Sequence, residues 1–166
     1  AQAAGHFPIN MQEMNIDLLA LPGHKGLFGP QGSGALIFGK EIKLRTQLEG
    51  GSGSASLDTE MPEDPPERYE AGTLSTPSIA GLCEGIKFVR SIGLDVISSH
   101  EKQLFWLTRG LLSDIPGCRI YAGEYPGSVI TFNLQGFPCD RVAYELGQRG
   151  ICVRGGFHCS PYAHET

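Results

Sequence analysis

The sequence predicts a mixed fold of the α/β or α+β class, and two observations lead to this prediction. Two short apolar runs, residues 16–21 and 34–38, are bounded by glycine and proline, as buried strands are. Beyond residue 76, the hydrophobic spacing predicts elements in the order helix, helix, strand, strand, helix, strand. The 166 residues suffice for one domain or two partial ones, and they contain no visible internal repeat.

Composition and charge argue against several classes of function. The chain is 40% hydrophobic and 19% charged, and no apolar run is long enough to span a membrane. With 13 Lys and Arg against 18 Asp and Glu, the net charge is −5, which argues against nucleic acid and anionic lipid as partners. The five cysteines are odd in number and lack a CxxC pair, which favours a reducing, cytoplasmic setting over a disulfide framework.

Both ends of the sequence are expected to be cut. The chain opens AQAAGHFPIN, with neither an initiator methionine nor the charged and apolar regions of a signal peptide. It stops at SPYAHET without a helix or strand to close the end. We therefore expect a segment of a longer protein.

The first part of the chain is predicted to hold a short helix and two strands. In PINMQEM, Asn10 is placed as the N-cap and Glu13 follows three residues later, in the arrangement of a capping box. The runs IDLLAL (16–21) and GALIF (34–38) then flank a glycine-rich loop. Residues 50–67 lose all periodicity and turn Gly/Ser-rich and then acidic and Pro-rich, so they are predicted to form a loop.

The remaining part is predicted to begin with two helices. Thr76 is placed as the N-cap of the first helix, Pro77 at its first position and Gly93 at its end. Each of the two helices, the second at about residues 95–115, carries apolar residues at helical spacing: Ile79, Leu82, Ile86 and Val89, then Ile97, Leu104, Leu107, Leu111 and Ile115. CRIY and SVITFNL are a predicted strand pair, residues 138–150 a third helix, and ICVR a last strand.

The segment LPGHKGLFGPQGSGALIF (21–38) places one lysine, Lys25, between a histidine and a run of glycines. The glycines and prolines let this backbone turn sharply and approach a ligand closely. A lysine held there away from bulk water would tend to lose its proton, and a neutral amine is a nucleophile toward an aldehyde. The segment is not a P-loop, because GxxxxGK[ST] is absent. From pattern alone, a solvated surface lysine is favoured by roughly two to one.

Three segments of the sequence resemble motifs of one enzyme family. DLLALPGHKGLFGPQGSGAL is similar to the cofactor-lysine segment of the class V aminotransferases, most closely of their cysteine desulfurase branch. RYEAGTLSTPSIAGL (68–82) and VRGGFHCSPYAH (153–164) resemble two further motifs of that family, in the same order. The resemblance runs essentially from Ala1 to Thr166 and is specific, because three motifs match in register.

The resemblance implies a partial fold of the fold-type-I transferases that depend on pyridoxal 5′-phosphate (PLP). Residues 1–50 would belong to the α/β sheet of the PLP-binding large domain. Residues 51–76 would be a loop and connection. Residues 77–166 would form a bridging helix and an incomplete C-terminal small α/β domain.

The resemblance also implies a role for each matching residue around the cofactor. Lys25 would form the internal aldimine with PLP and shuttle a proton to and from the substrate, while His24 would contact the phosphate. Gln2 would hydrogen-bond the phenolic oxygen of the cofactor. Thr73 would reach the phosphate bound by the partner subunit of a homodimer, although a turn or capping role explains it equally well. GGSGS (50–54) matches a family turn near the partner's site and is equally a plain flexible loop.

Cys159 lies in RGGFHCSP, next to His158 and five residues after Arg154. Nearby positive charge stabilises a thiolate. The resemblance implies that Cys159 takes the substrate sulfur as a persulfide, while Arg154 holds the substrate carboxylate. The alternatives are a buried small hydrophobe for Cys159 and a surface ion pair for Arg154. A zinc site at Cys152, His158, Cys159 and His164 ranks lower, because no CxxC or HxxxH spacing supports it. A Cys–His hydrolase also ranks lower, because no Asn or Asp that would orient the histidine is identifiable.

The sequence therefore predicts a PLP-dependent cysteine desulfurase without a metal, which converts L-cysteine to L-alanine and passes sulfur to an acceptor protein. A selenocysteine lyase or another class V aminotransferase or lyase is the enzymatic alternative. A non-catalytic scaffold is the alternative from a different class, favoured by Pro22 at a position where the family commonly carries Ser or Thr. The family's aspartate for the pyridinium nitrogen and its second carboxylate-binding arginine would lie outside the 166 residues. We therefore expect this chain alone to have little or no turnover.

Overall fold

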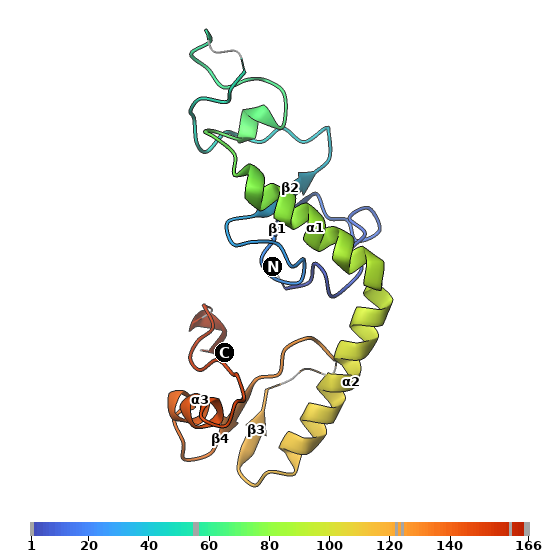
Figure 1. The fold of residues 1–166 in the computed structure, drawn as a ribbon, viewed down its shortest axis with the longest axis vertical. Coiled ribbons are helices and arrows are strands. Elements are labelled where there is room, and N and C mark those ends of the chain that lie inside the picture. Colours follow the sequence, from blue (N-terminus) through green and yellow to red (C-terminus); the bar gives the residue numbers. More distant parts are fainter. Residues whose placement is uncertain (1, 55–56, 122, 124, 160, 165–166) are drawn as a thin grey trace. The chain divides into compact units, whose positions relative to one another are not determined.

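Figure 1 shows the computed structural model of the chain, which describes residues 2–54, 57–121, 123, 125–159 and 161–164. The chain forms two compact units, Ala1–Ser98 and Ser99–Thr166, each with a two-stranded sheet. The boundary between them falls within the long helix α2 (Leu94–Ser113). Helices and strands are both present, as the sequence predicts, whereas the predicted domain boundaries after residues 50 and 76 stay a prediction.

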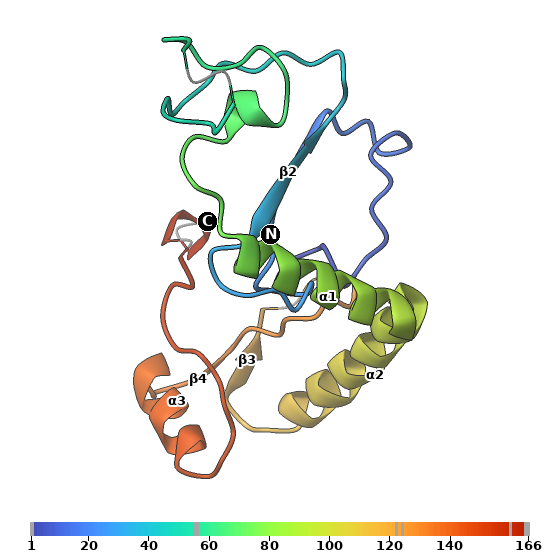
Figure 2. The same cartoon turned by 45° about the horizontal axis from the view of Figure 1, so that its top comes forward.

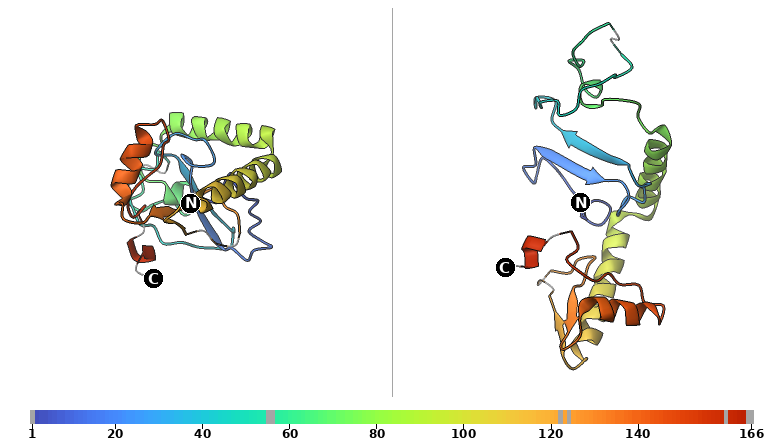
Figure 3. Two further views of the ribbon diagram at one scale, coloured as in Figure 1. Left: turned by 90° about the horizontal axis from the view of Figure 1, so that it is seen from below. Right: turned by 90° about the vertical axis from the view of Figure 1, so that its left-hand side faces the viewer.

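The first unit contains the two predicted strands. Strand β1 (Leu18–Pro22) pairs antiparallel with β2 (Gly34–Phe38), from Leu18 opposite Phe38 to Pro22 opposite Gly34, as the right-hand view of Figure 3 shows. The prediction that both strands are buried is wrong, since Leu36 is 48% exposed. Within the described part of the chain the two strands pair only with each other, and so narrow a ribbon leaves apolar side chains in solvent.

Helix α1 (Thr76–Ile92) follows the predicted course with two corrections. The first is that Ser75, and not Thr76, is the N-cap, whereas Gly93 closes the helix as predicted, with a φ of 92°. The second concerns its buried face. The buried positions are Leu82, Gly85 and Val89, while Ile79 and Ile86 of the predicted apolar face are 46% and 36% exposed. The buried stripe is therefore narrower than the predicted face and is centred on a glycine.

Two segments before α1 are less regular. The predicted helix near residue 10 is only a turn: Asn10 Oδ1 accepts from the backbone N–H groups of Gln12 and Glu13, but Asn15 has a φ of 52° and ends the turn. The predicted loop over residues 50–67 is confirmed for its described residues, 50–54 and 57–67, apart from the start of a short 3₁₀ helix, η1 (Glu67–Tyr69); residues 55 and 56 lie outside the described part of the chain. The Tyr69 hydroxyl accepts from the backbone N–H of Leu44 at 3.1 Å and so ties this region to the segment after β2.

The second unit holds the predicted strand pair and helix. Strand β3 (Cys118–Ile120) pairs antiparallel with β4 (Phe132–Leu134), and α3 (Cys139–Gly147) contacts β4, an arrangement visible in Figure 2. A short 3₁₀ helix, η2 (Pro161–His164), follows. The predicted ICVR strand is wrong: among the described residues, 151–154 have no ladder partner, because the only pairs of the unit are those of β3 and β4.

Few side chains of the described residues are fully buried. The buried apolar ones are Leu82, Val89 and Phe105. The predicted apolar face of α2 is largely uncovered, since Leu104, Leu107 and Leu111 are 47%, 60% and 62% exposed. In the part of the chain that the structure describes, no helix, α2 included, is both long enough and apolar enough to cross a membrane.

Candidate functional site

Lys25 lies on a closed loop between β1 and β2, residues 23–33, here called the lysine loop. Gly23 N donates to Ser33 O, and Gly29 N donates to Gly23 O, both at 2.8 Å. The Ser33 hydroxyl donates to Pro30 O at 2.6 Å, and Ser33 itself is only 9% exposed. These bonds close the base of the loop, so that its backbone is held although it contains no regular element.

We expect Ser33→Ala to lower the free energy of unfolding by about 1 kcal/mol, because it removes a part-buried hydrogen bond and leaves the Pro30 carbonyl with only the longer bond from Ser33 N, at 3.3 Å. Chemical denaturation followed by circular dichroism measures this. Ser91→Ala is the matched control, since the Ser91 hydroxyl also donates to a backbone carbonyl, that of Phe88, but at an exposed position. Equal losses for the two variants would show that the bond to Pro30 does not brace the lysine loop.

The side chains of Lys25 and His24 are exposed on the lysine loop. Lys25 O accepts from Phe28 N at 3.0 Å, and Phe28 has a φ of 56°, a left-handed conformation that is uncommon outside glycine. An exposed lysine agrees with a solvated charge as well as with a reactive amine. The chemistry of Lys25 is therefore assigned by the motif in which it lies.

The segment that carries Gln2 packs against the lysine loop. A Cβ placed on Gly26 would lie 2.5 Å from Ala4 O and 2.6 Å from His6 Nε2, and one placed on Gly5 would collide with Gly26 O. The turn at residues 3–7 therefore touches the backbone immediately after Lys25. Gln2, which is exposed, lies just before this turn, so the structure brings its segment to the lysine loop as the prediction requires.

Thr73 is placed beside the glycine turn at residues 50–54. Gly72 N donates to Gly51 O at 2.7 Å, which joins the two segments, and Thr73 is exposed next to this bond. Within the described residues, Thr73 makes no hydrogen bond to Lys25. In this chain Thr73 therefore belongs with the glycine turn and not with the lysine loop.

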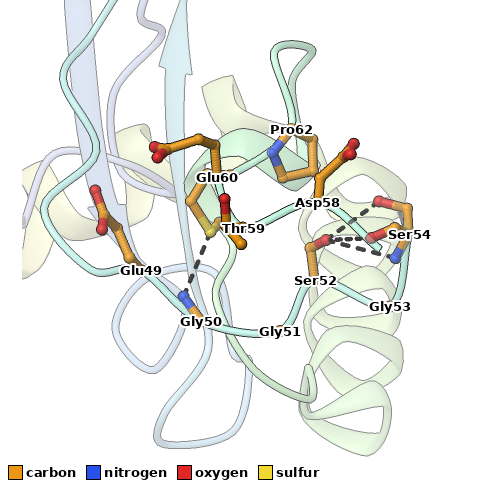
Figure 4. Close-up of a pocket in the computed structure, with 11 residues that line it drawn as sticks. Glu49, Gly50, Gly51, Ser52, Gly53, Ser54, Asp58, Thr59, Glu60 and Pro62 are labelled. Carbon is orange, nitrogen blue, oxygen red and sulfur yellow. Dashed lines mark hydrogen bonds between the residues drawn. The ribbon is translucent and has the colours of Figure 1, made fainter. Parts of the chain in front are cut away.

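A pocket of about 270 Å³ lies over the same glycine turn, as Figure 4 shows. Ser52 Oγ contacts Ser54 O and Ser54 Oγ, and Gly50 N donates to Met61 Sδ at 3.4 Å. Its lining residues are Glu49, Gly50, Gly51, Ser52, Gly53, Ser54, Asp58, Thr59, Glu60, Met61 and Pro62. None of the predicted site residues lines it, and its carboxylates disfavour an anion such as a phosphate in this chain alone.

The participation of the acidic stretch in this pocket was not predicted from the sequence. Asp58, Thr59 and Glu60 are exposed and line the pocket together with the glycine turn. The available signal was Met61, an apolar residue inside a charged segment, whose sulfur accepts from the turn.

In the second unit, Arg154 and Cys159 lie together. Arg154 Nη2 donates to Cys159 Sγ at 3.5 Å, and both side chains are exposed. His158 and Cys159 have φ angles of 53° and 63°, so two consecutive residues other than glycine hold left-handed conformations. Such outliers cluster at functional sites, where surrounding structure maintains the strain. The bend turns the cysteine back toward the arginine that precedes it in the sequence.

The other cysteines and a second cavity lie outside the predicted site. All five cysteines are free. Among the described residues no group of three or more His, Cys, Asp or Glu is placed to hold a metal, and the His164 side chain lies outside what the structure describes. The second cavity, about 710 Å³, is mainly apolar and lined by Thr108, Leu112, Ile115, Phe132, Leu134, Phe137, Arg141, Val142, Glu145, Leu146, Arg149, Ile151 and Val153.

Comparison with known sequences places this geometry in context. Residues 1–166 match the family described as aminotransferase class-V. A cysteine desulfurase of Synechococcus elongatus is 33% identical in an alignment 166 positions long, which covers 96% of this chain and 26% of that protein. A probable cysteine desulfurase of Staphylococcus aureus is 36% identical in an alignment 167 positions long, which covers 96% of this chain and 40% of that protein. The chain thus spans well under half the length of these relatives.

Solved structures give the same result for the fold. The apo cysteine desulfurase of Thermococcus onnurineus NA1 superposes with a TM-score of 0.90 at 31% identity, over 99% of this chain and 43% of that one. The Escherichia coli cysteine desulfurase CsdA superposes with a TM-score of 0.83 at 27% identity, over 95% and 40%. The predicted fold class, part of a PLP-dependent transferase of fold type I, is confirmed by these similarities.

Proposed function

Because the chain belongs to the class V aminotransferase family, we propose that the protein is a PLP-dependent cysteine desulfurase. Two relatives that match 96% of this chain carry that name, one of them as a probable cysteine desulfurase, which supports the choice of branch. The single observation that carries sulfur transfer is the contact between the Arg154 guanidinium and the Cys159 sulfur on a strained, exposed bend. A transaminase has no need of a thiol at this place.

The residues present fit the cofactor that the family implies. Lys25 offers a primary amine to an aldehyde, and among the described residues no carboxylate pairs with that amine. His24, Gln2 and Thr73 offer an imidazole, an amide and a hydroxyl, all able to donate to a phosphate or a phenolate. When bound, PLP supplies an aldehyde and an electron-withdrawing ring that stabilises negative charge on the substrate.

The chain's own residues then have separate tasks in the proposed reaction. Lys25 Nζ binds the aldehyde and afterwards carries a proton to and from the substrate α-carbon. Arg154 holds the carboxylate of L-cysteine through two parallel N–H donors. Cys159 Sγ attacks the substrate sulfur, so that an S–S bond forms while the substrate's Cβ–S bond breaks. The electron pair stays on Cβ, which takes a proton and leaves as part of L-alanine.

The proposal extends to the assembly and its partners. Thr73 lies apart from the lysine loop and beside the glycine turn. This placement agrees with a role in which Thr73 contacts the phosphate of the cofactor bound by the second subunit of a homodimer. The exposed Cys159 persulfide would be open to a sulfur-acceptor protein. Five free cysteines favour a reducing, cytoplasmic location.

The test uses the full-length protein loaded with PLP and supplied with L-cysteine. We expect equal amounts of alanine and of persulfide sulfur, with the persulfide on the peptide that contains Cys159, as mass spectrometry would identify. Release of selenium from L-selenocysteine without turnover of L-cysteine would favour the lyase alternative. Absence of both reactions, with no visible absorbance band after PLP is added, would favour the scaffold.

Substitution of the proposed carboxylate ligand gives a second prediction. We expect Arg154→Gln to raise the KM for L-cysteine roughly 10- to 100-fold, the loss that corresponds to a charge-assisted hydrogen bond. Steady-state kinetics measure it, with Arg149→Gln as the matched control, because Arg149 is an exposed arginine of the same unit that pairs with Glu145 at 3.0 Å. An unchanged KM in Arg154→Gln would contradict the assignment of Arg154.

A further inference from the structure

The lysine loop is in contact both with helix α1 and with the turn at residues 3–7. Figure 2 shows α1 lying against the segment that connects β1 to β2. The rings of Phe28, on the loop, and Phe88, on α1, meet edge to face with centroids 5.3 Å apart. All of these residues belong to the first unit, so the contact lies within one compact body.

Gly85 is the point of closest approach between α1 and the loop. A Cβ placed on Gly85 would collide with Leu27 O, and it would lie 2.9 Å from the carbonyl carbon of Phe28 and 3.1 Å from Gly29 N. These are backbone atoms, which cannot turn aside as the end of a flexible side chain can. Gly85 is buried in the middle of an otherwise regular helix, where glycine costs about 1 kcal/mol relative to alanine.

Gly81, one turn earlier on α1, makes a softer contact. A Cβ there would lie 2.6 Å from Cγ and 2.8 Å from Cδ of Pro30, which are atoms of a side-chain ring. Gly26 of the loop is in turn enclosed by Ala4 O and His6 Nε2. The backbone directly after Lys25 therefore packs against both the turn at residues 3–7 and α1.

We propose that Gly85 is a positioning residue for Lys25: the absence of a side chain at Gly85 lets α1 seat Leu27–Gly29 and thereby sets where the Lys25 amine lies. Gly85 is buried and has no side chain with which to reach a ligand. It acts through the backbone of the lysine loop, whose turn is closed by the bond from Phe28 N to Lys25 O. This inference rests on the proposed function, because it is the reactivity of the Lys25 amine that Gly85 would tune.

The test compares the same substitution, glycine to alanine, at three helical positions of the full-length protein. Gly85→Ala meets backbone, Gly81→Ala meets the Pro30 ring, and Gly110→Ala, on α2, meets nothing within 4 Å. Helix propensity favours each alanine by about the same 1 kcal/mol. Differences among the three variants therefore report the contact with the lysine loop.

The first measurement needs no cofactor. We expect amide hydrogen exchange at Leu27–Gly29 to rise about tenfold in Gly85→Ala, less in Gly81→Ala and not at all in Gly110→Ala. The second uses the protein loaded with PLP. We expect the pH midpoint of the absorbance band formed with Lys25 to shift by roughly half a pH unit or more in Gly85→Ala. We also expect kcat to fall about tenfold there with little change in the KM for L-cysteine.

A folded Gly85→Ala protein with the wild-type pH midpoint and kcat would overturn the proposal. If Gly85→Ala does not fold, Gly81→Ala decides: a midpoint that differs from that of the wild-type protein supports the proposal, and an unchanged midpoint overturns it. Failure of the proposed function is distinguishable, because the wild-type protein would then form no band that depends on Lys25. Hydrogen exchange at Leu27–Gly29 would still measure the contact with α1.

Discussion

Lys25→Ala is expected to abolish the visible absorbance band that the full-length protein forms with PLP, and to lower turnover of L-cysteine by at least roughly 10²- to 10⁴-fold. Lys25 provides the only primary amine of the lysine loop, and no other residue type there can condense with an aldehyde. Its side chain is exposed, so the change should leave stability within about 0.5 kcal/mol of wild type. Absorbance spectra and alanine release measure the two effects.

Lys40→Ala is the matched control, because Lys40 is an exposed lysine shortly after β2 and outside the lysine loop. It should retain both the band and turnover. Reduction with borohydride, followed by peptide mapping, should place the cofactor on the peptide that contains Lys25. Cofactor on another lysine, or an unchanged band in Lys25→Ala, would refute the role assigned to Lys25.

Cys159→Ser is expected to lower alanine formation from L-cysteine roughly 100-fold or more while the absorbance band with PLP is retained. A serine hydroxyl is close to isosteric with the thiol, but it cannot accept sulfur into a persulfide. Because Cys159 is exposed and its hydrogen bond to Arg154 is a long one of 3.5 Å, the fold should tolerate the change. Alanine release and thiol-specific mass spectrometry measure the outcome.

Cys152→Ser is the matched control, since Cys152 is a free, exposed cysteine of the same segment. It should turn over L-cysteine at the wild-type rate. Persulfide found on another cysteine, with normal turnover in Cys159→Ser, would show that Cys159 is not the acceptor. A selenocysteine lyase would have no need of the thiol, so turnover of L-selenocysteine alone, unaffected by Cys159→Ser, would favour that alternative.

Local signals predicted most of the regular elements. The strand at Gly34–Phe38 was predicted at its observed bounds, and α1 was predicted to within one residue of its N-cap. Glycine, proline and helical periodicity act over a few neighbouring residues, so they can be interpreted without the fold. Burial was predicted poorly for β2 and α2, because exposure depends on which elements cover a face and not on the apolar character of the face itself.

The failed strand at residues 151–154 has the same cause. ICVR has the composition of a strand, but a strand exists only where a neighbour offers hydrogen bonds, and Ile151 N instead donates to Leu146 O at the end of α3. The helix expected near residue 10 failed because its cap, Asn10, is followed by only one turn before Asn15 reverses the backbone.

By itself, the sequence determined the element types, the family motifs and the chemical identities of Lys25 and Cys159, because residue types and their spacing carry that information locally. Only the tertiary structure decided that α1 seats the lysine loop at Gly85 and that Arg154 donates to the Cys159 sulfur. A glycine inside a helical pattern was the one available hint of the first contact. Which backbone atoms this glycine contacts depends on the path of the chain between residues far apart in the sequence, and no local pattern specifies that path.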